Sequence, residues 1–220
     1  MTMRFTLVLA ILILILALPA AAFAAEPLLN QPHWSLGIKG GWFYPDIDNW
    51  KTYYGDDKTW QYAGSLAYKL TNRVEVGVEG GISKDQGQGK GAISGTVVGN
   101  VTYEVFPLQV FVLLRGALIE NQLIVPYVGG GWTRMFYEEK IEGQGTIHGH
   151  ADGYHGRAGL QFLLDGADIT ATRNLLRDYG IYHTYFFFET QYSRAMINDL
   201  SGASVNLGGT SYLMGLQFEF

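Results

Sequence analysis

Residues 211–220 read Ser-Tyr-Leu-Met-Gly-Leu-Gln-Phe-Glu-Phe, and every second side chain in this stretch is large and apolar. The even positions share an apolar face, while the odd positions carry serine, leucine, glycine, glutamine and glutamate. A period of two is typical of a β-strand, because successive side chains of a strand point to opposite faces. The stretch predicts a strand whose two faces meet different surroundings.

Seven more alternating runs precede this one. In the third, valine, glycine and isoleucine on the even positions alternate with glutamate and glycine, whereas Gly129-Gly130-Gly131 leaves the two faces of the fifth undecided. The eight runs are Trp34–Tyr44, Tyr62–Leu70, Val74–Ile82, Thr96–Leu118, Val125–Tyr137, Tyr154–Phe162, Tyr182–Ser193 and Tyr212–Phe220. Eight antiparallel strands can close into a barrel with no free edge, which is what lipid demands of a spanning sheet.

The fourth run changes phase at Phe106-Pro107. Its apolar residues occupy odd positions before the proline and even positions after it. Proline cannot donate to a ladder, and one extra residue exchanges the two faces of a strand. The pattern therefore predicts a β-bulge at this point.

The composition agrees with a β protein. The chain has 220 residues, of which 48% are hydrophobic and 14% aromatic, with 29 glycines. This pairing of glycine with aromatic residues disfavours a helical bundle. The net charge of −5 disfavours nucleic-acid binding, because a nucleic-acid binder needs basic side chains to contact the phosphates. The absence of cysteine excludes disulfides, thiolate metal sites and a lipoprotein anchor.

The first segment reads as an export signal. Arg4 precedes an apolar stretch, and Ala22-Phe23-Ala24 offers small residues at the −3 and −1 positions of a cleavage site. We predict Sec-type export with a cleaved signal peptide at residues 1–24 and a single barrel domain at 25–220. The alternative is an uncleaved anchor, since about 20 apolar residues can span a bilayer.

Two features favour a membrane barrel over a soluble lipocalin-like barrel with an apolar inside. The connections are long after Tyr44, Ile82, Tyr137 and Arg194, and shorter after Leu70 and Leu118, as in barrels with long outer loops. Aromatic residues also gather toward the ends of the apolar faces and predict girdles at the two interfaces. They are Trp34, Trp42, Tyr44, Trp60, Tyr68, Tyr103, Tyr127, Tyr154 and Tyr192.

Two short stretches resemble known outer-membrane proteins. The C-terminus resembles the signal read by the barrel-assembly machinery: Gly215, Phe218 and Phe220 match, while Leu213 stands where a polar residue is usual. Residues 125–131, Val-Pro-Tyr-Val-Gly-Gly-Gly, resemble a run of OmpW-like and OmpX-like eight-stranded proteins. The resemblance implies an outer-membrane location, with outer-membrane lipid and the assembly machinery as partners. It implies no particular activity, because such families include conduits, adhesins and proteins of unknown role.

If the apolar faces meet lipid, eight charged side chains point inward. Counted from the strand ends, Lys39, Glu79, Arg157 and Glu189 fall near mid-depth, and Lys69, Glu75, Arg115 and Glu219 fall lower. An eight-stranded lumen is only wide enough for its own side chains. We predict two balanced layers that plug the barrel; the alternative is a gated polar conduit or proton path.

Candidate chemistry is sparse. His148, His150 and His155, with Asp152, are weak candidates for a metal site, although the neighbouring glycines indicate a flexible polar loop instead. We predict no metal and no cofactor. His183 is followed by Thr184 and Tyr185, with Ser193 ten residues on, so this histidine forms no His-x-Ser arrangement like that of lipid A deacylases. The aromatic segment 46–55 suits either interface anchoring or ligand stacking.

Residues 168–180 depart from the strand pattern. An aspartate N-cap, apolar residues at helical spacing and a final glycine predict a short amphipathic periplasmic helix between the sixth and seventh strands. It would cover the barrel mouth, dock a partner or lie on the inner leaflet. The sequence thus predicts a monomeric, non-catalytic barrel with a structural or surface-interaction role. A conduit for small hydrophobic molecules is the alternative, and a lipid-modifying enzyme is third.

Overall fold

A computed structural model describes residues 32–47, 50–90, 97–119, 121–142, 145–198 and 204–220. The predicted signal peptide and cleavage site lie outside the described residues. Within the described part of the chain, no helix is long and apolar enough to cross a membrane.

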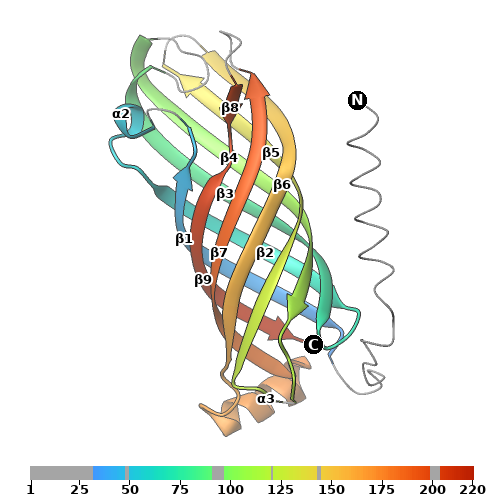
Figure 1. Ribbon diagram of the computed structural model, residues 1–220. Coiled ribbons are helices and arrows are strands. Elements are labelled where there is room, and N and C mark those ends of the chain that lie inside the picture. The colour runs from blue at the N-terminus through green and yellow to red at the C-terminus, as the bar shows by residue number, and fades with distance from the viewer. Residues whose placement is uncertain (1–31, 48–49, 91–96, 120, 143–144, 199–203) are drawn as a thin grey trace, which may run out of the picture.

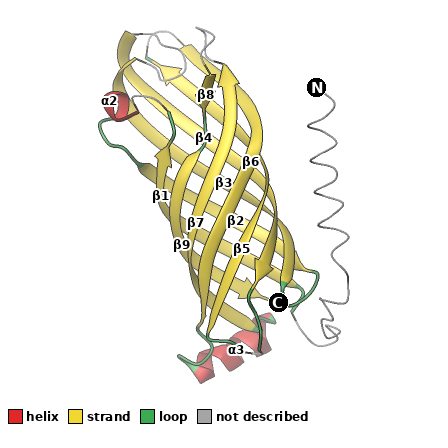
Figure 2. Ribbon diagram, in the orientation of Figure 1, coloured by secondary structure: helices red, strands yellow, loops and turns green. Residues whose placement is uncertain are grey.

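The strands form a closed antiparallel barrel (Figures 1 and 2). Its eight strands are β1 (Trp34–Pro45), β2 (Thr59–Lys69), β3 (Val74–Lys90), β4 (Val97–Arg115), β5 (Ile124–Ile141), β6 (Gly145–Leu163), β7 (His183–Asn198) and β9 (Gly209–Glu219). Neighbours in the chain pair with one another, and β9 pairs with both β7 and β1. The last strand therefore closes the ring, as the alternating pattern predicted. A short strand, β8 (Ser204–Asn206), pairs only with the end of β7.

Two helices mark the ends of the barrel. At one end α2 (Trp50–Tyr54) lies between β1 and β2, and at the other α3 (Ile169–Tyr179) joins β6 to β7 (Figure 2). We call these the α2 end and the α3 end. The predicted helix is confirmed with its caps, because Asp168 accepts from two backbone N–H groups and Gly180 adopts φ 69°. The sequence did not predict α2.

Four strands extend beyond the runs read from the sequence. β3, β5, β6 and β7 have 17, 18, 19 and 16 residues, whereas β4 stays within its predicted run. Much of the predicted loops after Ile82 and Tyr137 is therefore strand. Paired residues such as Lys84 and Glu104 continue the β3–β4 ladder toward the α2 end, with polar side chains on the outer face. The loop prediction was wrong there because apolar alternation reports lipid contact, whereas backbone pairing continues into water.

The predicted bulge at Phe106-Pro107 is also wrong. The β3–β4 register runs to Gly80 opposite Leu108 and resumes unshifted at Ser83 opposite Val105. The described shift lies farther along, between Gln88 and Gly89. Odd residues of β4 point inward throughout. Those that precede Pro107, Val101, Tyr103 and Val105, are apolar because they face the apolar cluster at the α2 end.

The outer wall carries the expected apolar band. Leu36, Val78, Val110 and Phe188 are among the exposed apolar side chains, and Trp42 and Trp60 pack together with ring centroids 5.6 Å apart. Two predicted girdle residues are inside instead, because Tyr103 and Tyr127 occupy odd, inward positions. The predicted placement of aromatic residues on the outer wall is correct in general and wrong for Tyr103 and Tyr127.

Candidate functional site: a barrel interior in two halves

The middle of the lumen holds a square of ion pairs. Lys39 Nζ lies 2.8 Å from Glu79 and 2.5 Å from Glu189, while Arg157 Nη1 lies 2.7 Å from Glu79 and 3.8 Å from Glu189. The four residues come from β1, β3, β6 and β7, and all are buried. Two cations and two carboxylates thus neutralise one another across the lumen.

Glycines make room for this layer. A Cβ on Gly215 would come within 2.8 Å of the Lys39 Cβ, and one on Gly159 within 2.5 Å of the Tyr127 ring. Tyr127 uses that space to donate its hydroxyl to Glu189 at 2.9 Å. The Arg157 guanidinium rests 4.5 Å from the ring centre of Phe111. Small residues on one strand therefore admit large side chains from another.

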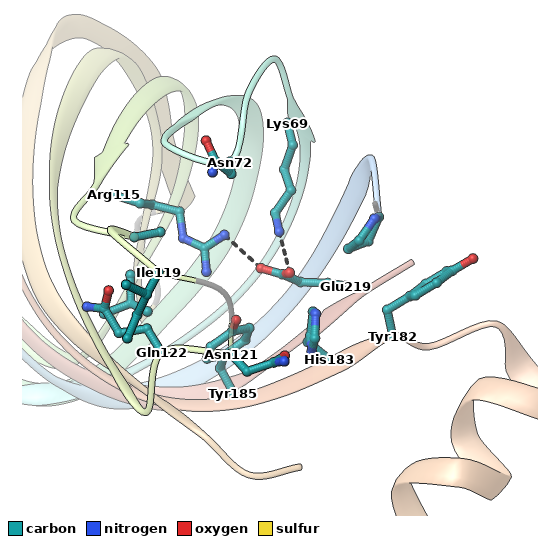
Figure 3. A pocket seen from close by; sticks show the side chains of 13 residues that line it. Lys69, Asn72, Arg115, Ile119, Asn121, Gln122, Tyr182, His183, Tyr185 and Glu219 are labelled. Atoms are coloured by element: carbon teal, nitrogen blue, oxygen red, sulfur yellow. Dashed lines mark hydrogen bonds and ion pairs between the residues drawn. The ribbon is translucent and has the colours of Figure 1, made fainter. Parts of the chain in front are cut away.

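A second charged layer lies nearer the α3 end (Figure 3). Arg115 Nη1 lies 2.8 Å from Glu75 and 2.7 Å from Glu219, and Lys69 pairs with Glu219. Arg115 Nε also donates to Gln161 at 3.0 Å, and Gln161 donates to Gln217 at 2.8 Å. The eight charged residues singled out in the sequence therefore lie in two groups, and the ion pairs that these described residues form lie within each group.

A cavity of about 240 Å³ opens below the lower layer. Lys69, Arg115, Tyr182, His183 and Glu219 are among its lining side chains, and Figure 3 shows the ion pairs that form its inner wall. Above that wall, between the two layers, the remaining space is only about 20 Å³. This is room for about one water molecule, so the cavity ends at the lower layer.

Neutral polar side chains complete both layers. Arg157 Nη2 donates to Gln109 at 2.6 Å and lies 3.2 Å from His155 Nε2. Ser211 donates to Gln61 at 2.6 Å. The sequence analysis missed Gln61, Gln109 and Gln161 because it followed charge alone. Their inward positions in the alternation were the available signal.

The α2 end of the lumen holds an apolar cluster, beside which Glu139 and several neutral polar side chains are also buried. The buried side chains of the cluster are Phe43, Ile47, Trp50, Tyr54, Tyr103, Val105, Met135, Ala151, Ala195 and Leu207. Trp50 stacks on Tyr54 with centroids 4.0 Å apart and meets the Tyr103 ring edge-on at 5.3 Å. Of the aromatic segment 46–55, Trp50 and Tyr54 are thus buried in the mouth. They serve neither as interface anchors nor as an exposed stacking surface.

The loop after β1 is tied down where it enters this cluster. Asn206 donates to the Asp46 carboxylate at 2.9 Å and accepts the Ala195 backbone N–H at 2.9 Å. These bonds connect β8, β7 and the residues before α2. They hold the loop over the mouth, so that α2 closes the α2 end.

The three histidines do not gather. His148 and His150 lie on the exposed face of β6, whereas His155 is buried inside at 3% exposure. An odd spacing on one strand sends the side chains to opposite faces. Asp152 pairs instead with Arg134 at 2.8 Å. No group of three metal-ligating side chains occurs among the described residues.

The wall has a gap in its ladder beside Pro107. Gly81 and Ile82 of β3 have no paired partners in β4, opposite Phe106 and Pro107. The backbone N–H of Arg115 donates to the Arg73 carbonyl oxygen, so the backbone N–H groups of the odd-numbered β4 residues point toward β3. Pro107 stands at an odd position and has no N–H to donate, so the ladder is interrupted there. An apolar hollow of about 660 Å³ lies over the gap on the outer face.

The residues of the C-terminal signal lie on the strand that closes the barrel. Gly215 faces inward opposite Lys39, and Phe220 is exposed on the outer face. Phe220 also exchanges backbone hydrogen bonds with Trp34 at 2.8 and 2.9 Å. Recognition of Gly215, Phe218 and Phe220 by the assembly machinery stays a prediction.

An apolar outer band around a closed, polar-filled ring of eight strands defines a transmembrane β-barrel. The family described as "Outer membrane protein beta-barrel domain" matches residues 10–213. The chain belongs to this family, and the strands therefore cross the outer membrane. The resemblance to small eight-stranded barrels is confirmed.

Solved structures show the same fold. The outer membrane protein OprG from Pseudomonas aeruginosa is 15% identical, with 89% of this chain and 99% of that chain covered and a TM-score of 0.55. Neisserial surface protein A is 8% identical, with 85% and 96% covered and a TM-score of 0.54. A search of curated proteins found no match. At these identities the likeness concerns the fold alone.

Proposed function

We propose that this protein is a non-catalytic outer-membrane barrel that is closed to ions and acts through its extracellular end. The observation that carries the proposal is the pair of ion-paired layers across the lumen. We take the α3 end as periplasmic, because the C-terminus lies there and the polar extensions of β3 to β6 project from the opposite end. The α2 end, with its extended strands, then projects outward as a structural or surface-interaction element.

The closure follows from charge balance and space. Each buried cation has at least one carboxylate within 2.8 Å, so an entering ion would have to separate a buried pair. The Trp50 cluster fills the opposite half of the lumen. Both charged and apolar paths along the axis are therefore blocked.

A non-catalytic role agrees with the placement of the reactive side chains. His183 bonds to Asp165 at 2.6 Å near the α3 end, while Ser193 is buried ten residues along the same strand. Ten residues of strand span about 33 Å, far beyond proton-transfer distance. The seryl hydroxyl therefore has no base in His183. The partners we expect are outer-membrane lipid and the assembly machinery, with the protein as a monomer.

Planar-bilayer conductance tests the closure. We expect the purified, refolded protein to show heat-modifiable mobility on gels and no steady conductance. Replacing only the middle-layer cations, Lys39→Ala with Arg157→Ala, should leave the barrel closed, because the lower layer and the Trp50 cluster remain. Adding Arg115→Ala and Trp50→Ala should produce conductance. Steady conductance of the unaltered protein would refute the proposal.

A second candidate function is the sideways passage of small apolar molecules into lipid. The gap beside Pro107 favours it, because the hollow over Gly80, Gly81 and Phe106 is apolar and faces the membrane. The apolar cluster at the α2 end lies behind this part of the wall, since Val105 and Met135 belong to it. A small apolar molecule that entered at the α2 end and displaced α2 would contact the side chains of this cluster until it reached the gap beside Pro107.

Pro107→Val tests this candidate, since valine restores the missing N–H without adding charge. Cells carrying the barrel in the outer membrane would be given N-phenylnaphthylamine, which brightens in lipid. We expect uptake to fall with Pro107→Val and to persist with Pro126→Val. Pro126 is a control because it is exposed and lies near the start of β5, away from the gap. Equal uptake by both variants would reject the lateral route.

A further inference from the structure

The helix α3 stands clear of the barrel that it joins. None of its eleven residues is buried. Of the described side chains that line the cavity at the α3 end, none comes from α3. In Figure 1 the helix lies across that end of the barrel, beyond the ends of the strands. It is therefore not packed into the mouth as a lid.

The helix has an unpartnered apolar face. Ile169, Leu176 and Tyr179 share one side at 3.6 residues per turn and are 60%, 44% and 75% exposed. Asn174 and Asp178 lie on the opposite side, where Asp178 pairs with Arg177 at 2.8 Å. At 100° per residue, Arg173 and Arg177 fall beside the apolar face. An apolar stripe flanked by long cationic side chains is typical of a helix at a membrane surface.

The apolar face continues the lipid-facing band of the wall. Leu160 of β6 and Phe188 of β7 are exposed on the strands that lead to and from the helix. Leu164 and Tyr182, exposed at 37% and 43%, bridge the interval on either side of α3. The turn between β4 and β5 adds exposed apolar side chains at the same end: Leu118, Ile119 and Leu123. Exposed apolar side chains therefore stand close to both ends of the helix in the sequence, with only residues 165–168 between Leu164 and Ile169.

We propose that α3 lies on the phospholipid headgroups of the periplasmic leaflet, with Ile169, Leu176 and Tyr179 in the acyl boundary. Arg173 and Arg177 reach the phosphates from the edge of the apolar face, since long cationic side chains keep their charge in water while their stems lie on apolar surface. Covering the mouth would instead turn the apolar face toward Lys69, Arg115 and Glu219. At the membrane surface the apolar face of the helix contacts acyl chains and its polar face contacts water and headgroups. At the charged mouth the apolar face would contact ionised side chains instead.

Site-directed spin labelling tests this placement, because the chain has no cysteine and a single one can be labelled cleanly. Leu176→Cys probes the apolar face, and Asn174→Cys is the matched control two residues away. The protein would be reconstituted in vesicles of phosphatidylethanolamine and phosphatidylglycerol. Collisions of each label with oxygen, which enters lipid, would be compared with those of a nickel chelate, which stays in water.

We expect the oxygen-to-nickel collision ratio at residue 176 to exceed that at 174 several-fold. Equal, high nickel access at both positions would place the helix in water and overturn the proposal. Low access to both probes at 176 would show that protein covers the face, and would also overturn it. Ile169→Cys with Thr170→Cys provides a second pair if a label at 176 prevents folding.

Discussion

The two halves of the lumen are filled by opposite chemistry. The half toward the α3 end joins eight charged side chains into two neutral layers, and the half toward the α2 end packs Trp50, Tyr103 and Leu207 as a soluble protein packs its core. Both sets of side chains are buried, yet their tolerance of change differs. An apolar cluster loses contacts in proportion to what is removed, whereas a buried ion pair leaves an uncompensated charge when one partner goes. The five predictions below test this contrast.

The largest effect is expected from Arg157→Leu. It leaves Glu79 and Glu189 to share Lys39, so we expect a loss of about 3–5 kcal/mol in the free energy of unfolding. Urea unfolding in lipid vesicles would measure the loss, and the temperature of the heat-modifiable gel shift should fall with it.

The double variant Arg157→Leu with Glu79→Leu sharpens the comparison. Removing both charges of a pair should cost less than removing one, because no carboxylate is then left unpaired. A double variant less stable than Arg157→Leu alone would show that the layer acts through packing, as the half toward the α2 end does.

Trp50→Ala should have the next largest effect, up to about 3 kcal/mol, because it empties the centre of the apolar cluster. We expect its consequence to stay at the α2 end, where trypsin should cut faster after Lys51 and Lys58. Unchanged cleavage at these sites would mean that α2 is held by Asp46 and Asn206 rather than by Trp50.

Gly159→Ala should cost about 1–3 kcal/mol, since the new methyl group meets the Tyr127 ring. The Tyr127 hydroxyl would then lose its place beside Glu189. Gly80→Ala is the matched control, because nothing lies within 4 Å of its new methyl group. Equal stabilities of the two variants would argue against close packing between the layers.

The smallest effect is expected from Arg134→Leu. This residue pairs with Asp152 at 2.8 Å on the exposed face, and exposed pairs contribute about 0–1 kcal/mol. Urea unfolding of Arg134→Leu and of Arg157→Leu would be compared, so that the loss of unfolding free energy is measured for an exposed and for a buried ion pair. A loss from Arg134→Leu as large as that from Arg157→Leu would contradict the contrast.

Much of this architecture was accessible from alternation. Lys39, Glu79, Arg157 and Glu189 fell on inward positions at similar depth, and they lie together in the structure. The same reasoning failed for Tyr103 and Tyr127, which were assigned to the wall because they are aromatic. The three histidines, named only as weak metal candidates, are divided between the two faces of β6, with His155 inside and His148 and His150 outside.

The errors share one physical origin. A period of two shows that the surroundings differ on the two sides of a strand, but not which side is lipid, protein or water. Before Pro107, β4 faces an apolar interior, and after it a charged one, so the apolar residues changed position without any bulge. The missing ladder pairs at Gly81 and Ile82 depend on how β3 and β4 face one another, which neither strand shows alone.

The sequence by itself determined the number of barrel strands, the closing strand and the helix between β6 and β7, because each depends on local periodicity or on capping residues. Only the tertiary structure decided the partner of each charge, the burial of Trp50 in the mouth and the gap beside Pro107. These features depend on side chains from strands far apart in the sequence. Their distances are fixed only when β9 closes against β1.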